Sequence, residues 1–247
     1  MTPQTPNINR RRAFALLAVV FFMTIIDLTI VNVSLPTIGR HLHFSQTSLQ
    51  WVVTAYALTF GGVLLLGGRA ADLFGRRRIL MAGLSVFTAA SLACALAGSE
   101  AFLIAGRAIQ GLGAAIMVPA ALSIVMNMFR EGADRNKALG IWGGLGAGGA
   151  TVGVIAGGVL TRYAGWQYIF YLNVPIGVAA LLLAPRIVPE SRADTMRRKF
   201  DAAGAVAGTA GLCSSWTPSP RHRSTAGVPP GRSACSPRQP CCSPRSS

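Results

Sequence analysis

Two charged side chains, Asp27 and Arg107, lie deep inside long apolar runs of the sequence. At the centre of a bilayer an isolated charge costs about 2.5–3.5 kcal/mol on insertion scales, so this carboxylate and this guanidinium are natural partners. The pair has two interpretations: a proton-transfer site in which the cation tunes the carboxylate, or a permanent ion pair that locks two helices together. We favour the first, because ionisable groups inside membranes mark ion and substrate paths by default.

Helical spacing gives both charges polar or small neighbours. Residues three or four positions apart share one face of a helix, so Thr24 shares a face with Asp27, and Gln110 shares one with Arg107. Faces that carry charge inside a membrane turn toward the bundle interior. We therefore predict two inward faces, which comprise Thr24, Asp27, Val31 and Ser34 in one run, and Arg107, Gln110, Gly111 and Ala114 in the other.

A short basic stretch, residues 68–78, separates two further apolar runs. Its glycines, Gly68 and Gly75, suit backbone positions that need a positive φ or close helix contact. Asp72 precedes the next helix start, where the helix dipole and the partners Arg76 and Arg77 favour a carboxylate. The polarity of the stretch predicts a tight turn between two membrane spans.

The apolar runs indicate an all-α membrane protein. Of the 247 residues 51% are hydrophobic and 13% are charged, and several runs reach the roughly 18–20 residues that cross a bilayer. The net charge of +15 does not indicate a nucleic-acid partner, because the charges lie between apolar runs and not on one soluble face. The sequence contains no nucleophile–base–acid set and no metal-binding cysteine spacing, so we expect no enzyme, no metal and no cofactor. The six predicted spans are 14–36, 50–68, 79–98, 102–128, 139–160 and 167–184.

The distribution of Lys and Arg predicts how these spans are oriented. Outside the spans and up to residue 199, only Arg40 and Arg162 fall in segments on the side opposite the N-terminus. By the positive-inside rule the N-terminus is cytoplasmic, and the bundle lies in the plasma (inner) membrane, surrounded by the lipid bilayer. The predicted division is a cytoplasmic N-terminus (1–12), a six-span bundle (13–188), a cytoplasmic loop (189–201), an incomplete seventh span (202–216) and a disordered Pro/Ser/Arg tail (217–247).

The predicted span 139–160 is rich in glycine, which would break a soluble helix but lets membrane helices pack closely. The four-residue spacing of Gly149, Gly153 and Gly157 predicts a ridge of small residues. Gly140 and Gly158 add to the same helix. Plain close packing is the alternative to a specific functional role.

The stretch 68–78 resembles the loop signature of the major facilitator superfamily, Gly-x-Leu-Ala-Asp-Arg-x-Gly-Arg-Lys-x, with matches that include Gly68, Asp72, Gly75 and Arg76. Further motifs resemble its fourteen-span drug:proton antiporter branch. Residues 27–36 resemble the first-span signature, 107–115 the span-4 motif that this branch links to proton transfer, and 165–177 another stretch typical of it.

The glycines of the fifth span are similar to the antiporter signature Gly-x8-Gly-x3-Gly-Pro-x2-Gly-Gly, with Val154 in place of the proline. The resemblance implies the N-terminal six-helix bundle of a transporter that exports drug-like amphipathic molecules in exchange for protons. It implies proton coupling by Asp27, Arg107 and Gln110, a cytoplasmic gate at Gly68, Asp72, Gly75, Arg76 and Arg77, and helix packing by Gly140, Gly149, Gly153, Gly157 and Gly158. It also implies a second transporter half, against which the first half rocks.

Two alternatives remain open. A facilitator or symporter of another small solute is favoured by Val154, because the signature's proline bends the helix in antiporters. An inactive truncated fragment is favoured by the chain length, because the family needs twelve or more spans. The abrupt change of composition near residue 212 indicates an aberrant end, such as a frameshift product.

Overall fold

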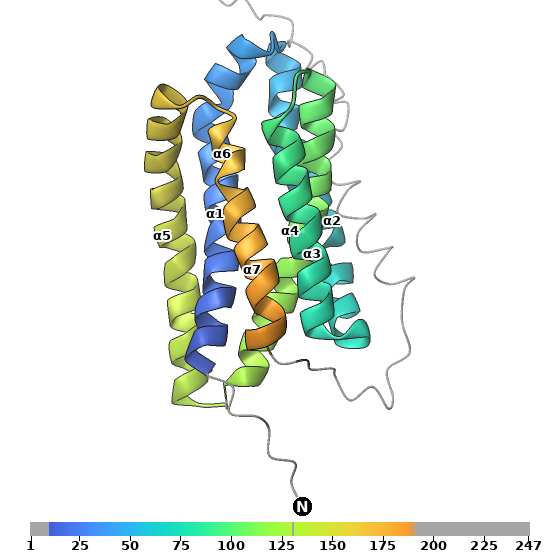
Figure 1. Cartoon of the computed structure of the whole chain (residues 1–247), viewed down its shortest axis with the longest axis vertical. Helices are drawn as coiled ribbons and strands as arrows, with labels where there is room; N and C mark the ends of the chain where they lie inside the picture. Colours follow the sequence, from blue (N-terminus) through green and yellow to red (C-terminus); the bar gives the residue numbers. More distant parts are fainter. Residues whose placement is uncertain (1–9, 130, 189, 191–247) are drawn as a thin grey trace, which may run out of the picture. The chain divides into compact units, whose positions relative to one another are not determined.

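The computed structural model describes residues 10–129, 131–188 and 190, and these residues form α-helices joined by short turns (Figure 1). The predicted segments 202–216 and 217–247, and most of 1–12 and 189–201, lie outside the described residues. The helices are α1 (Arg10–His41), α2 (Gln46–Phe74), α3 (Arg76–Ala95), α4 (Glu100–Met128), α5 (Ala133–Tyr163), α6 (Tyr168–Tyr171) and α7 (Asn173–Ile187). The last two follow one another, so the described residues contain six helical segments long and apolar enough to cross a membrane, as predicted.

Local chemistry explains where several helices begin. Ser45 caps α2, because its hydroxyl accepts from the backbone N–H of Ser48 at 3.1 Å, and Ser99 caps α4 in the same way. The sixth span divides into α6 and α7 just before Pro175, whose nitrogen has no hydrogen to donate to the carbonyl of Tyr171. Capping residues and a proline thus set element bounds within an otherwise continuous apolar pattern.

The basic stretch 68–78 contains the predicted tight turn, but most of its residues are helical. Helix α2 continues through Asp72 to Phe74, and α3 begins at Arg76, so Gly75 alone separates them. Gly75 has φ 104° and ψ 127°, a conformation that L side chains rarely adopt. Gly68 is helical and has no positive φ. The charged residues here project from helix ends because such ends extend beyond the hydrocarbon of the bilayer.

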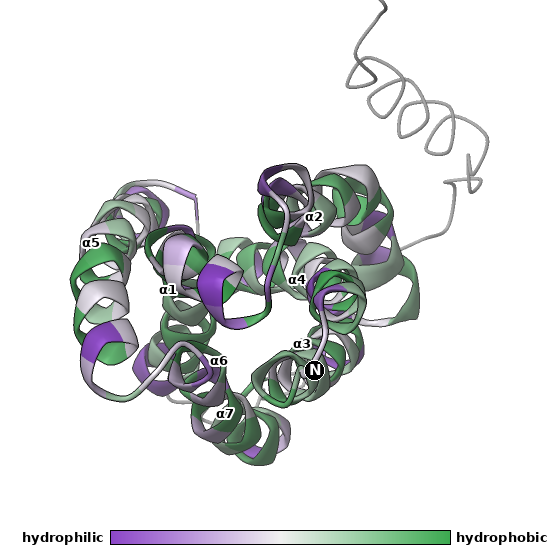
Figure 2. Cartoon of the chain, turned by 90° about the horizontal axis from the view of Figure 1, so that it is seen from above, coloured by the Kyte–Doolittle hydropathy of each residue, from purple (hydrophilic) through white to green (hydrophobic). Residues whose placement is uncertain are grey.

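The bundle is held together by close helix pairs. Helix α4 packs against α2 and α3, α1 packs against α5 and α7, and α3 packs against α7, as the two views in Figures 1 and 2 show. Small residues make the contacts close: a Cβ on Gly113 of α4 would lie 2.6 Å from the backbone nitrogen of Phe87 on α3. Without a hydrophobic force between helices in lipid, this van der Waals packing supplies much of the association.

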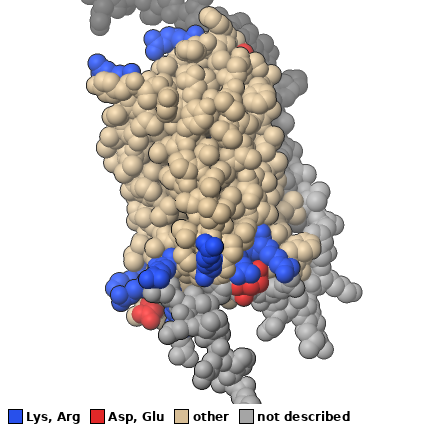
Figure 3. All heavy atoms as spheres, viewed as in Figure 1, with Lys and Arg blue, Asp and Glu red and all other residues tan. Residues whose placement is uncertain are grey.

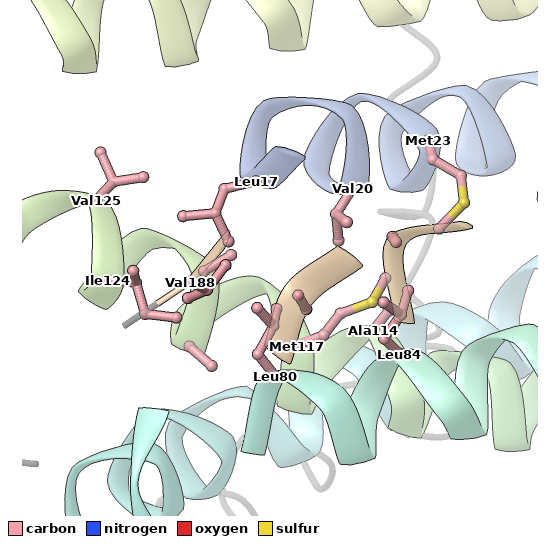
Figure 4. Close-up of a cluster of buried hydrophobic side chains, with 14 of the residues drawn as sticks. Leu17, Val20, Met23, Leu80, Leu84, Ala114, Met117, Ile124, Val125 and Val188 are labelled. Carbon is pink, nitrogen blue, oxygen red and sulfur yellow. The ribbon is translucent and has the colours of Figure 1, made fainter. Parts of the chain in front are cut away.

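Two apolar clusters form the core. The first joins α1, α3 and α4 through residues such as Leu17, Leu84 and Met117 (Figure 4). The second lies toward the opposite ends of these helices, where it includes Ile38 of α1 and Phe170 of α6. Along α1 the first cluster reaches Met23 and the second begins at Ile26, so the level of Asp27 lies where the two clusters meet.

The face of the molecule in Figure 3 is a belt of uncharged residues with charges at its two ends. Large apolar side chains such as Leu65 (58% exposed) and Leu182 (64% exposed) stand on the outer surface. A water-soluble fold would bury side chains of this kind, whereas a bilayer accommodates them. The surface therefore agrees with an all-α integral membrane protein.

Candidate functional site

Asp27 and Arg107 meet in the middle of the bundle. Arg107 Nη1 of α4 donates to Asp27 Oδ2 of α1 at 2.7 Å. The two side chains are 0% and 1% exposed. The ion pair that the sequence predicted is therefore present and fully shielded. Breaking such a pair leaves an uncompensated buried charge, which typically costs about 3–5 kcal/mol.

Gln110 connects the two charges and extends the network. Its amide nitrogen donates to Asp27 Oδ1 at 2.9 Å and to the Ser91 hydroxyl of α3 at 2.8 Å. Its amide oxygen accepts from Arg107 Nη1 at 2.6 Å. Because Gln110 lies one helical turn after Arg107, the two side chains reach Asp27 from the same face of α4, as the spacing predicted.

Besides Ser91, three further groups in this network were not identified from the sequence. Asn173, at the start of α7, donates to Asp27 Oδ1 at 2.7 Å. The carbonyl of Val52 in α2 accepts from Arg107 Nε at 3.2 Å, and the ring of Tyr56 lies 4.2 Å from the guanidinium carbon. Asn173 is a neutral polar residue in an apolar run, a signal that indicates a buried hydrogen bond but not its partner.

The polar network forms one layer between the two apolar clusters. On α1, α3, α4 and the α6–α7 span, members of the first cluster lie on one side of it and members of the second on the other. Thr24 and Ser34 are buried on the face that also carries Asp27, and Ser34 lies 2.6 Å from the Thr161 hydroxyl of α5. One carboxylate on α1 is therefore hydrogen-bonded to both α4 and α7.

A second cluster of charges surrounds Gly75. Arg76 donates to the carboxylate of Asp72 across the break at 2.9 Å, and the Arg76 residue is 8% exposed. Glu190 accepts from the backbone N–H of Arg77 at 3.2 Å and lies 3.5 Å from its Nε. Arg77 also donates to the carbonyl of Val188 at the end of α7. Glu190 was not identified from the sequence, because no local pattern places it beside residue 77.

The glycine-rich helix α5 packs against α1 through part of its predicted set. A Cβ on Gly149 would lie 3.0 Å from Ile25, and one on Gly157 would lie 3.1 Å from the Ile30 carbonyl. Gly153 approaches Thr29 more closely still. The ridge is therefore present, and it is a helix–helix contact.

Gly140 and Gly158 do not belong to this contact. Both are exposed, and no described atom lies within 4 Å of a Cβ built on either. Each is nine residues from Gly149, which is about half a turn off its face at 100° per residue. Among the described residues neither glycine has a packing partner, so the packing role predicted for them stays a prediction. Val154 is 53% exposed, and α5 runs unbroken from Ala133 to Tyr163.

These features define a multi-span helical membrane protein with a shielded ionisable network, an arrangement typical of proteins that move solutes or ions. The family model described as Major Facilitator Superfamily matches residues 17–237. The chain belongs to this superfamily of transporters, as the motifs indicated.

Relatives agree with this family, and a solved structure has the same fold. The chain is 42% identical to the puromycin resistance protein pur8 of Streptomyces alboniger over 85% of its own length. It is also 42% identical to the cephamycin export protein CmcT of Amycolatopsis lactamdurans over 81% of its length. The chain spans 41% of the length of each. A crystal structure of the peptide transporter POT in complex with alafosfalin has a TM-score of 0.64 at 19% identity, over 83% of this chain and 46% of that one.

Proposed function

We propose that residues 10–188 form one half of a transporter that exports drug-like amphipathic molecules in exchange for protons. The observation that carries the proposal is the Asp27 carboxylate, held at the meeting of three helices by Arg107, Gln110 and Asn173. Relatives that match most of the chain are named for puromycin resistance and for cephamycin export, which supports a drug-like substrate. Export requires a second half, against which this bundle rocks in alternating access.

In the proposed mechanism Asp27 is the proton carrier. As an anion it accepts three hydrogen bonds and pairs with Arg107, which ties α1 to α4 and α7. A proton on Asp27 removes the charge that attracts Arg107 and weakens the ties between these helices. Arg107 retains the Val52 carbonyl and the Tyr56 ring as partners in that state. Proton binding thereby biases the packing of α1, α4 and α7 toward a different arrangement.

The charges around Gly75 are the proposed cytoplasmic gate. Asp72 and Arg76 join α2 to α3, and Glu190 joins the start of α3 to the end of α7. This end of the bundle carries most of its Lys and Arg (Figure 3), which by the positive-inside rule faces the cytoplasm of a plasma (inner) membrane. The N-terminus of α1 is at the same end.

Inverted membrane vesicles test the proposed function. Residues 1–188 are joined in frame to the second half of a relative, and a fluorescent cationic dye is added outside. We expect dye accumulation when the vesicle interior is acidic, collapse of accumulation when a proton exchanger dissipates the gradient, and no gradient-driven accumulation with Asp27→Asn. Accumulation that needs no proton gradient would contradict proton coupling.

A second candidate is a symporter or facilitator of another small solute, favoured by the unbroken α5 with Val154 at the position of the antiporter proline. The same vesicles distinguish the candidates. An acidic interior drives accumulation by an antiporter, an acidic exterior drives it by a symporter, and a facilitator only equilibrates the solute across the membrane.

A further inference from the structure

A groove of about 560 Å³ opens on the outer surface between the first half of α1 and helix α7. Its walls include Ala15 and Val19 on α1 and Pro175, Ala179 and Leu183 on α7, with Arg12 at one end. The short side chains of Ala15 and Ala179 leave a hollow between the two helices at this level. Neither the ion-pair network nor the charges around Gly75 use this surface.

The length of the groove matches one leaflet of a bilayer. Its α7 wall runs from Pro175 to Ile187, about 18 Å at 1.5 Å per residue. Half of a hydrocarbon core is about 15 Å. The helices α1 and α7 run in opposite directions, so Arg12 lies at the Ile187 end. The other end lies two residues from Asn173, which contacts Asp27. The groove therefore runs from the membrane surface to the level of the buried network.

The charge at the mouth of the groove is positive. Arg12 follows Arg10 and Arg11 in the first turn of α1. Among the ion pairs of the described residues none involves Arg12. A basic residue at the end of an apolar groove between membrane helices fits a lipid phosphate over an acyl chain.

We propose that this groove holds one acyl chain of an anionic phospholipid, with the lipid phosphate bound to Arg12. The site goes beyond the proposed transport function and does not depend on it. The basic residue at the end of the groove favours a lipid over another helix as the occupant, because Arg12 is matched by a phosphate that lies at the membrane surface. A small-molecule or single-chain ligand fits the range of about 300–1,000 Å³ that is usual for such sites.

The test is native mass spectrometry of the purified 247-residue chain, titrated in detergent with dioleoyl phosphatidylglycerol or dioleoyl phosphatidylcholine. One basic contact corresponds to about fivefold in affinity. We therefore expect the anionic lipid to bind at least about fivefold more tightly, and Arg12→Ala to remove this preference. Arg12→Lys should keep most of it, which shows that the charge and not a folding defect is responsible.

Two matched controls separate the groove from general surface effects. Arg11→Ala removes the same charge one residue away, outside the groove lining, and should keep the preference. Ala179→Phe should fill the groove and remove the bound lipid, whereas Val178→Phe, on the same helix but outside the lining, should keep it.

The proposal is wrong if both lipids bind equally, if Arg11→Ala and Arg12→Ala act alike, or if Ala179→Phe retains full binding. It is also wrong if glycerol phosphate, which has no acyl chain, competes as well as the intact anionic lipid. A loss of dye transport in the vesicle assay has no bearing on these outcomes.

Discussion

At the scale of single residues, the carboxylate of Asp27 uses both of its oxygens. Oδ1 accepts from Gln110 and Asn173, and Oδ2 accepts from Arg107. A charge that would be costly in a bilayer is thereby fully satisfied within the protein. The residue that the mechanism requires to change charge is also the residue that ties three helices together.

The ion pair can be tested for its energetic coupling. Arg107→Gln leaves the Asp27 carboxylate without its cation, and we expect a loss of about 3–5 kcal/mol in the free energy of unfolding at neutral pH. Asp27→Asn combined with Arg107→Gln removes both charges and should cost less than Arg107→Gln alone. Denaturant titration in mixed micelles measures the free energy of unfolding of the double variant and of each single variant, Arg107→Gln and Asp27→Asn. Strictly additive costs of the two single changes would show that the charges are not coupled.

The sequence was enough to predict the two charged residues of this network, but it did not predict most of the neutral residues that bind them. Asp27 and Arg107 are identifiable because a charge in an apolar run demands a partner. Ser91 and Asn173 are much less costly in a membrane, and their side chains have several possible partners, so only the three-dimensional packing of α3 and α7 reveals their role.

At the scale of elements, the contact between α1 and α5 depends on glycine at defined register. Gly153 leaves no room for a side chain beside Thr29 and the Ile26 carbonyl, whereas Gly158 faces away from α1. We expect Gly153→Leu to force the helices apart and lower the thermal stability of the chain in lipid nanodiscs. Gly158→Leu places the same side chain on the same helix at an exposed position and should change stability little.

This pair of variants also tests the register argument. Equal loss of stability with both substitutions would show that leucine disturbs α5 itself and not its contact with α1. The spacing of Gly149, Gly153 and Gly157 in steps of four was enough to predict the ridge. Gly140 and Gly158 matched a motif but not the period of the helix, and the helical period decided their position.

The basic stretch 68–78 is mostly helical, because α2 continues through it to Phe74. Its polarity predicted a turn, yet Arg69, Ala70 and Leu73 form helices readily, and polar residues are tolerated where a helix leaves the hydrocarbon. The sequence offered both Gly68 and Gly75 for a backbone position with a positive φ, and in the structure only Gly75 has one.

At the scale of the whole molecule, the charges around Gly75 are expected to control how the bundle moves. In a completed transporter, Arg76→Ala and Asp72→Asn should each slow dye export about tenfold or more, because each removes a charge-assisted hydrogen bond worth roughly 1.5–3 kcal/mol. Membrane insertion should be unchanged, as measured by the amount of protein in the membrane fraction. Undiminished export by both variants would remove the gate role.

The chain of residues 1–247 on its own is expected to insert into membranes and to give no transport. It spans 41% of the length of the relatives pur8 and CmcT, and one half cannot alternate access without a second wall. Cells that express it should export a cationic dye no faster than cells with an empty vector, and joining a second half in frame should restore export. Dye export above the vector control by the chain alone would contradict this expectation.

If Asp27 exchanges its proton for substrate, the binding of substrate should release that proton into solution. The completed transporter is purified in weakly buffered detergent solution, and a cationic drug is added while the pH of the solution is recorded. If this exchange occurs, we expect release of about one proton for each drug molecule bound, and none with Asp27→Asn although that variant still binds drug. Equal proton release by the wild type and Asp27→Asn would contradict it.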